Sequence, residues 1–154
     1  GGKSPRIHVG SSTLKNGNTY KHYKFGRANK DMRHIHRLLY NKDGKKEITR
    51  KSLDYMNDEA WYYFWLDDGG LSKNYKQNGH LGSFEAHLYF YVPKDEALEI
   101  QKYFWEVYGI NFKLALHRKT GLYTLRANTK ESNKFFAIID KFKGRVPSLS
   151  YKFP

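Results

Sequence analysis

The sequence contains no cysteine, which excludes disulfide bonds and metal sites built on thiolates. It also lacks an apolar run long enough to span a membrane, and it has no recognisable secretory signal. We therefore expect a soluble protein with no membrane partner, and the sequence does not determine its cell compartment. Acidic residues are few: 28 Lys and Arg stand against 15 Asp and Glu, and the net charge is +13. Such an excess attracts polyanions and favours a nucleic-acid partner, DNA or RNA alike.

The most informative stretch of the 154 residues runs from Asp58 to Leu71 and reads DEAWYYFWLDDGGL. Residues 61–66 are all large and mostly apolar, so a helix here is expected to be buried on every side. Asn57 in front of it is a suitable N-cap. We expect Gly69 and Gly70 to end the helix in a left-handed conformation.

Two acids, Asp67 and Asp68, stand at the end of this predicted helix, where the helix dipole already disfavours negative charge. Asp-Gly pairs are common in turns, so an ordinary loop is one interpretation. A metal site is the other, because Mg²⁺ is bound by one or two carboxylates, with waters and phosphate oxygens completing its coordination. The buried aromatic helix in front of the two acids favours the metal site.

The rest of the chain alternates between hairpins and helices. We predict hairpins over residues 1–27, 71–92 and 111–128, and helices capped by Asn29 and Thr129 and over residues 94–108, with a polar linker over 41–52. From residue 57 onward the order is helix, two strands, helix, two strands, helix, which is an α+β fold. The positions expected in the core include Met32, Ile35, Leu38 and Leu39 of the first helix, and Leu98, Tyr103, Phe104 and Val107 of the helix over 94–108.

Alternation along the predicted strands separates an apolar face from a polar one. Phe84, Ala86 and Leu88 share one face of the second hairpin, and polar residues share the other. An ordinary solvated face is one interpretation, but long basic and polar side chains also pair with phosphates and base edges. The candidates for DNA contact are Arg6, His8, His22, Lys24, Lys73, Lys76, Gln77, His80, Glu85, His87, Lys113, His117, Arg118, Thr124 and Arg126.

The run from Trp61 to Gly70 resembles the signature helix of the LAGLIDADG homing endonucleases, in the subgroup whose motif is aromatic residues followed by Asp-Asp-Gly-Gly. The resemblance implies that Asp68, the residue before the first glycine, binds a divalent metal, Mg²⁺ or Mn²⁺, with Asp67 ranked second. It also implies a curved antiparallel sheet whose polar face lies in the DNA major groove. Two motif helices would pack side by side and bring one acid each to the scissile phosphates.

Two lysines resemble further parts of the family pattern. Lys46, in the run Lys-Glu-Ile, is similar to the segment before a second motif helix, where a lysine acts near the cleaved phosphate. Lys152, in the tail Ser-Tyr-Lys-Phe-Pro, is similar to a family ending whose lysine approaches the active site. The resemblance therefore implies Asp68, Lys152 and Lys46 as catalytic residues. Each lysine also has the simpler interpretation of a solvated surface residue.

The function that the resemblance implies is site-specific cleavage of double-stranded DNA at a long target site. Only one motif is visible, so we expect the second to come from another chain or from a missing N-terminal segment. We accordingly divide the chain into a partial unit, residues 1–56, and a complete unit, residues 57–154. An RNA-splicing cofactor for introns, called a maturase, and a non-cleaving DNA-binding module are the alternatives. Asp68 favours the nuclease, because an acid that faces phosphate weakens a pure binder.

Overall fold

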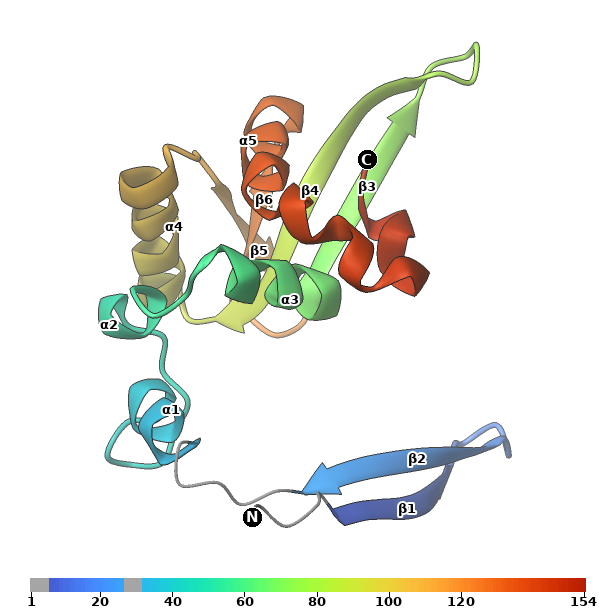
Figure 1. Ribbon diagram of the computed structural model, residues 1–154, viewed down its shortest axis with the longest axis vertical. Coiled ribbons are helices and arrows are strands. Elements are labelled where there is room, and N and C mark those ends of the chain that lie inside the picture. Colours follow the sequence, from blue (N-terminus) through green and yellow to red (C-terminus); the bar gives the residue numbers. More distant parts are fainter. Residues whose placement is uncertain (1–5, 27–31) are drawn as a thin grey trace.

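The computed structural model describes residues 6–26 and 32–154 and divides them between a smaller and a larger part (Figure 1). The smaller part holds a hairpin and one helix, and a connecting segment leads into the larger part. Predictions that fall on residues 1–5 and 27–31, including the cap at Asn29, lie outside the described residues. The elements are β1 (Arg6–Thr13), β2 (Thr19–Gly26), α1 (Met32–Leu39), α2 (Arg50–Leu53), α3 (Asp58–Asp68), β3 (Gly69–Tyr75), β4 (Leu81–Val92), α4 (Lys94–Tyr108), β5 (Lys113–His117), β6 (Leu122–Ala127), α5 (Thr129–Ile139) and the 3-10 helices η1 (Asp140–Arg145) and η2 (Pro147–Lys152).

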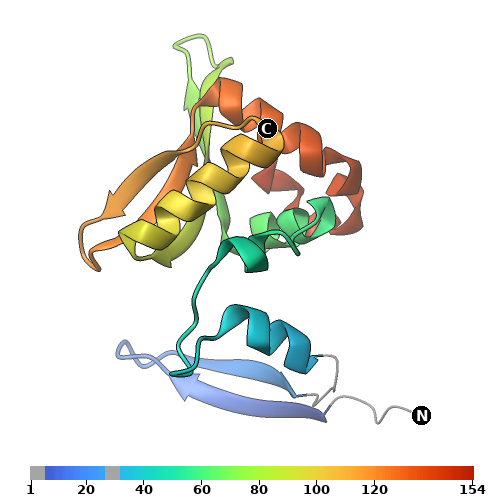
Figure 2. The ribbon, with the colours of Figure 1, turned by 90° about the vertical axis from the view of Figure 1, so that its left-hand side faces the viewer.

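All strand pairs in the described residues are antiparallel. β1 pairs with β2, and the larger sheet has the order β3-β4-β6-β5. Helices α3, α4 and α5 cover one face of the larger sheet and leave the other face open (Figure 1 and Figure 2). The predicted α+β class is confirmed, and so is the order helix, two strands, helix, two strands, helix in the larger part.

Helix α3 supplies the centre of the hydrophobic core. Trp61, Tyr62 and Trp65 are fully buried, packed among phenylalanines of α4, α5 and η1. Tyr63 is 49% exposed, however, and Asp67 is exposed on the same side one turn later. The prediction of burial on every side is therefore wrong, because the sheet, α5 and η1 pack against only part of the helix surface.

The junction between α3 and β3 also differs from the prediction of a left-handed cap. Gly69 has φ −97° and ψ 151°, an extended conformation, and β3 begins at this residue without a loop. A Cβ at Gly69 would lie 2.2 Å from Cε3 of Trp65, and one at Gly70 would lie 2.7 Å from Cε2 of Tyr89. Close approach to aromatic rings, rather than an unusual backbone angle, therefore requires both glycines.

Helix α5 is tied to the sheet by hydroxyl groups. Asn128, not Thr129 as predicted, is the N-cap, and its side chain accepts a hydrogen bond from Glu131 N. The Thr129 hydroxyl instead donates to Phe84 O at 2.8 Å and accepts from Phe84 N at 3.0 Å. These bonds use backbone groups of β4 and hold α5 on the covered face of the sheet.

Helices α1 and α4 bury only some of the positions predicted for the core, and Leu38 and Leu39 of α1 are half buried. In α4 the buried residues are Ala97, Ile100, Tyr103 and Phe104. The predictions for Tyr103 and Phe104 therefore hold, whereas Leu98 and Val107 are about half exposed. In α1 Ile35 is 45% exposed, because the connecting segment and hairpin leave that helix face open; the Met32 side chain lies outside the described residues. None of the helices in residues 6–26 and 32–154 is long and apolar enough to cross a bilayer.

One prediction follows from the α3–β3 junction. Gly69→Ala is expected to lower the free energy of unfolding by about 1–3 kcal/mol, because its new methyl group would overlap the Trp65 ring. Gly144→Ala is the matched control, since a Cβ there meets nothing within 4 Å. Equilibrium unfolding in urea measures both. Equal midpoints for the two variants would contradict the close packing described at Gly69.

Candidate functional site

The two acids occupy the last two positions of α3, and both are exposed. Because β3 starts immediately after them, their carboxylates stand at the corner between the helix and the sheet. No group of three His, Asp or Glu side chains in the described part of the chain is arranged to hold a metal ion. What this corner offers is thus one or two carboxylates rather than a complete set of metal ligands.

A cavity of about 330 Å³ lies beside this corner, between the connecting segment, α2, α3 and the end of β4. Its lining is mostly apolar, and its charged members are Lys46, Asp68 and Glu96. Glu96 accepts a hydrogen bond from Ile48 N at 2.8 Å, which fixes the segment that carries Lys46. The fold therefore brings two of the three predicted catalytic residues, Lys46 and Asp68, to the same cavity.

The third predicted catalytic residue, Lys152, is bound to the end of α3. Its Nζ donates to Leu66 O at 2.7 Å, to Gly69 O at 3.0 Å and to Asp67 O at 3.4 Å. Carbonyls at a helix C-terminus lack partners within the helix, and the dipole there favours a cation. Lys152 therefore neutralises and fixes the helix end from which the two acids project.

The chain tail that carries Lys152 is itself anchored. Phe153 is buried against Tyr62 and Phe136, and its carbonyl accepts a hydrogen bond from Lys73 Nζ at 3.1 Å. Lys73 pairs with the buried Phe84 across the sheet, so it belongs to the covered face. The structure thus places Lys73 away from the face where DNA contact was predicted, because strand alternation turns it toward the tail.

The open face of the larger sheet carries a row of polar residues across three strands. His87 of β4 lies opposite Arg126 of β6, which lies opposite Lys113 of β5. Burial lowers the pKa of His87, and nearby Arg126 lowers it further, while Glu85 acts in the opposite direction. His87 is therefore neutral at pH 7, and Arg126 and Lys113 provide the positive charge of this row.

Other predicted contacts lie around this row. Lys76, Gln77 and His80 are exposed at the end of the β3–β4 hairpin, which extends beyond the sheet in Figure 1. His117 and Arg118 lie where β5 turns toward β6. These residues and the central row thus form one broad surface.

Several residues that were predicted to contact DNA lie away from this surface or are poorly accessible on it. Thr124 is only 6% exposed, and its hydroxyl donates to Ala115 O at 3.3 Å, so little of it is accessible to DNA. His8 and His22 lie on the hairpin of the smaller part, with the His22 ring packed on Gly10. The side chains of Arg6 and Lys24 lie outside the described residues.

Sequence reasoning missed three polar residues on the open face. Ser72 pairs with Glu85 across the sheet, and its hydroxyl lies 3.2 Å from Nε2 of His87. Asn74 pairs with Ser83, and the Asn74 amide donates to the Ser83 hydroxyl at 3.3 Å. Strict alternation from Gly70 would have identified Ser72 and Asn74 and would have excluded Lys73.

Comparisons with known proteins agree with this geometry. Residues 5–135 match the LAGLIDADG DNA endonuclease family. A solved structure described as the homing endonuclease I-WcaI bound to its DNA recognition sequence matches 97% of this chain at a TM-score of 0.78 and 16% identity. This chain spans 63% of the length of that endonuclease. No curated protein matches.

The structural likeness shows a shared fold, and the family match covers most of the chain. The predictions of a LAGLIDADG fold and of a LAGLIDADG relationship are thereby confirmed. The chain belongs to the LAGLIDADG DNA endonuclease family.

Proposed function

We propose that this chain supplies one acidic motif of a site-specific, metal-dependent endonuclease that cuts double-stranded DNA. The observation that carries the proposal is the position of Asp68, exposed at the corner between the motif helix and the open, basic face of the sheet. We further propose that the chain belongs to the aromatic-motif subgroup, which the aromatic helix followed by Asp-Asp-Gly-Gly supports.

The open face of the larger sheet is the proposed DNA-binding surface. A two-stranded ribbon fits the major groove, where side chains reach both base edges and phosphates. Arg126 and Lys113 supply cations at the centre of this face, and the β3–β4 hairpin extends the surface with Lys76, Gln77 and His80. The net charge of +13 adds long-range attraction to the phosphate backbone. The homing endonuclease of the same fold is bound to its DNA recognition sequence, which supports the same class of ligand here.

A divalent ion, Mg²⁺ or Mn²⁺, fits the exposed carboxylate of Asp68. Such ions are commonly held by one or two carboxylates together with waters and substrate phosphates, so a complete protein cage is unnecessary. When bound, the ion would stabilise negative charge on the attacking and leaving oxygens. Lys152 holds the carbonyls beneath the acids, and Lys46 lines the cavity beside Asp68, where its positive charge would attract the phosphate.

The second acid would come from a second motif helix. Tyr63 leaves part of the α3 surface open, and the cavity lined by Phe64 and Asp68 of the same helix has apolar walls. An apolar helix from another chain, or from a segment that precedes this one, would fill this space and bring its own acid to the corner. Residues 1–56 would then be part of a first unit, and residues 57–154 would be a whole second unit.

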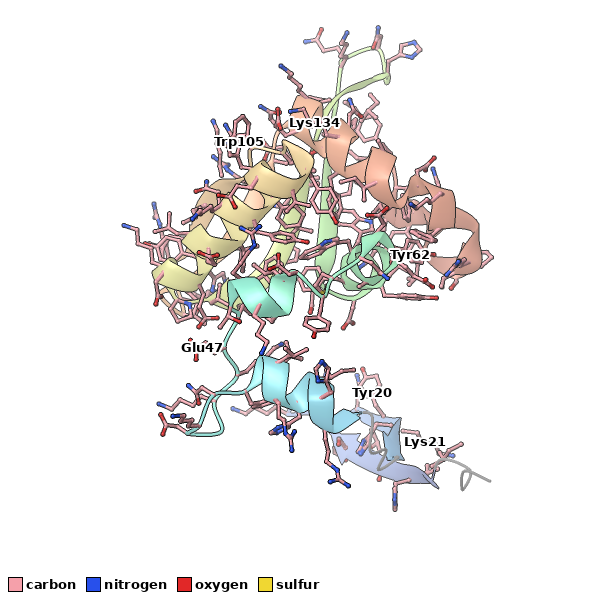
Figure 3. All side chains as sticks on the ribbon, turned by 60° about the vertical axis from the view of Figure 1, so that its left-hand side comes forward. Tyr20, Lys21, Glu47, Tyr62, Trp105 and Lys134 are labelled. Carbon is pink, nitrogen blue, oxygen red and sulfur yellow. The ribbon has the colours of Figure 1, made fainter. Side chains whose placement is uncertain are left out.

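An intron RNA-splicing cofactor is the second candidate function. Trp105 on α4 is 60% exposed on the outside of the larger part (Figure 3). Unpaired RNA bases stack on exposed aromatic rings, so this tryptophan would suit an RNA ligand. The acid at the corner still favours the endonuclease, because a pure RNA binder gains nothing from it.

The role of Asp68 gives one prediction. Asp68→Asn should reduce cleavage of a randomised duplex library in Mg²⁺ on the order of 10³-fold, because loss of metal binding removes several kcal/mol of transition-state stabilisation. DNA affinity in Ca²⁺ should stay equal or rise, since a negative charge near phosphate is removed. Asp67→Asn is the matched control and should retain most cleavage. Equal loss of cleavage in both variants would contradict the assignment.

The DNA-binding surface gives a second prediction. Arg126→Ala and Lys113→Ala should each weaken binding to the selected duplex about tenfold, because each removes a cation from the groove-facing row. Lys102→Ala is the control, since Lys102 lies on α4, on the covered side of the sheet. Fluorescence anisotropy at several salt concentrations measures the affinities. A loss as large for Lys102→Ala would indicate that only net charge matters.

The contacts of Lys152 give a third prediction. Lys152→Met should lower the free energy of unfolding by about 1–3 kcal/mol, because carbonyls at the α3 terminus lose a charged partner. Cleavage should fall in the same variant, because the acids lose their support. Lys152→Arg should restore part of both. If Lys152→Met abolished cleavage with no change in stability, Lys152 would act directly on the substrate instead of positioning the helix end.

A further inference from the structure

Strand β4 has a local irregularity on the open face of the sheet. Leu88 pairs with Leu125 and Val92 pairs with Tyr123, so Tyr89, Phe90 and Tyr91 lie opposite Thr124 alone. Tyr91 has φ 50°, the one positive φ of a non-glycine residue in the described part of the chain. A bulky side chain is strained in this region of backbone space, and such strain persists only where the surrounding structure imposes it.

The irregularity places four rings in a continuous ladder. His87 and Tyr89 stack with centroids 5.9 Å apart, Tyr89 and Tyr91 stack at 6.0 Å, and Tyr91 meets His117 edge-on at 5.1 Å. The Tyr89 ring lies over Gly70, where any Cβ would overlap it. The ladder therefore runs along β4, where Tyr89 covers Gly70 of β3, and ends at His117 of the far strand β5.

Packing of the core does not account for Tyr91. Its side chain is 43% exposed, whereas the adjacent Phe90 turns to the opposite side and stacks on Phe64 of α3 at 4.4 Å. Tyr91 also lines the cavity that contains Asp68. An exposed, oriented ring thus lies between the DNA-binding surface and the acidic corner.

We propose that Tyr91 determines part of the DNA specificity by contacting the C5-methyl group of a thymine in the base pairs next to the cleaved phosphate. The inference rests on the proposed DNA-binding function of the open face. In the major groove the C5-methyl of thymine is the apolar group by which an A·T pair is distinguished, and an aromatic ring can contact it. Because the ladder already orients the ring, little side-chain entropy is lost on binding.

The experiment uses the whole chain and duplexes taken from a randomised library. Selection in Ca²⁺ first identifies the sequence that the parent chain prefers. Each thymine of that duplex is then replaced by uracil, which removes only the methyl group. We expect uracil at one or two positions near the cut to weaken binding about fourfold, the effect of losing one buried methyl group.

Three variants decide whether Tyr91 is responsible. The Tyr91→Asn variant should bind thymine and uracil duplexes equally at those positions. Because asparagine tolerates a positive φ, the unfolding temperature of this variant should be unchanged or higher. Tyr91→Phe keeps the ring and should retain the fourfold difference. Tyr55→Asn removes an exposed tyrosine from the segment between α2 and α3 and should also retain it.

Two results would overturn the inference while leaving the proposed function intact. One is a parent chain that selects a sequence but is insensitive to every uracil near the cut. The other is a Tyr91→Asn variant that keeps the difference, or that unfolds at a clearly lower temperature, which would make Tyr91 a packing residue. If the parent chain selects no DNA sequence at all, the proposed function fails and this inference fails with it.

Discussion

The contact between Gly69 and the Trp65 ring is the constraint on which the rest of the site depends. It lets β3 begin at the residue after the last turn of α3, with no loop between them. The helix is held in the core by fully buried tryptophans, and the strand is the edge of the sheet. Asp68 therefore stands at a fixed corner between two rigid elements, which is a more defined position than a flexible loop would provide.

The negative charge of the two acids at the end of α3 is unfavourable, and a lysine compensates for it. Two carboxylates at a helix C-terminus add negative charge where the dipole is already negative. Lys152 offsets this by donating to Leu66 O and Gly69 O, and it comes from the end of the chain, 86 positions away from Leu66. Lys73 in turn holds the tail through Phe153 O. Two lysines thus serve the geometry of the acids, while Arg126 and Lys113 supply charge to the open face.

The exposed side of α3 supports the proposal of a partner motif. A helix that is aromatic all round is normally enclosed, yet Tyr63 is half exposed, and Phe64 and Asp68 of the same helix line a cavity with apolar walls. The smaller part of the chain lies below α3 in Figure 2 and Figure 3, beyond the connecting segment that Glu47 marks in Figure 3. The exposed part of α3, the cavity and the incomplete set of carboxylates all involve this one helix, which is why we infer a second helix beside it.

The sequence by itself determined the order of elements, the two faces of each strand and the aromatic helix that ends in two acids. These features depend on residues close together in the chain, whose relations follow from the periods of helices and strands. Only the tertiary structure decided that Lys73 and Lys152 bind backbone carbonyls, that Gly69 is extended, and that Leu98 is exposed while Ala97 is buried. Those outcomes depend on contacts between segments far apart in sequence, which no local period encodes.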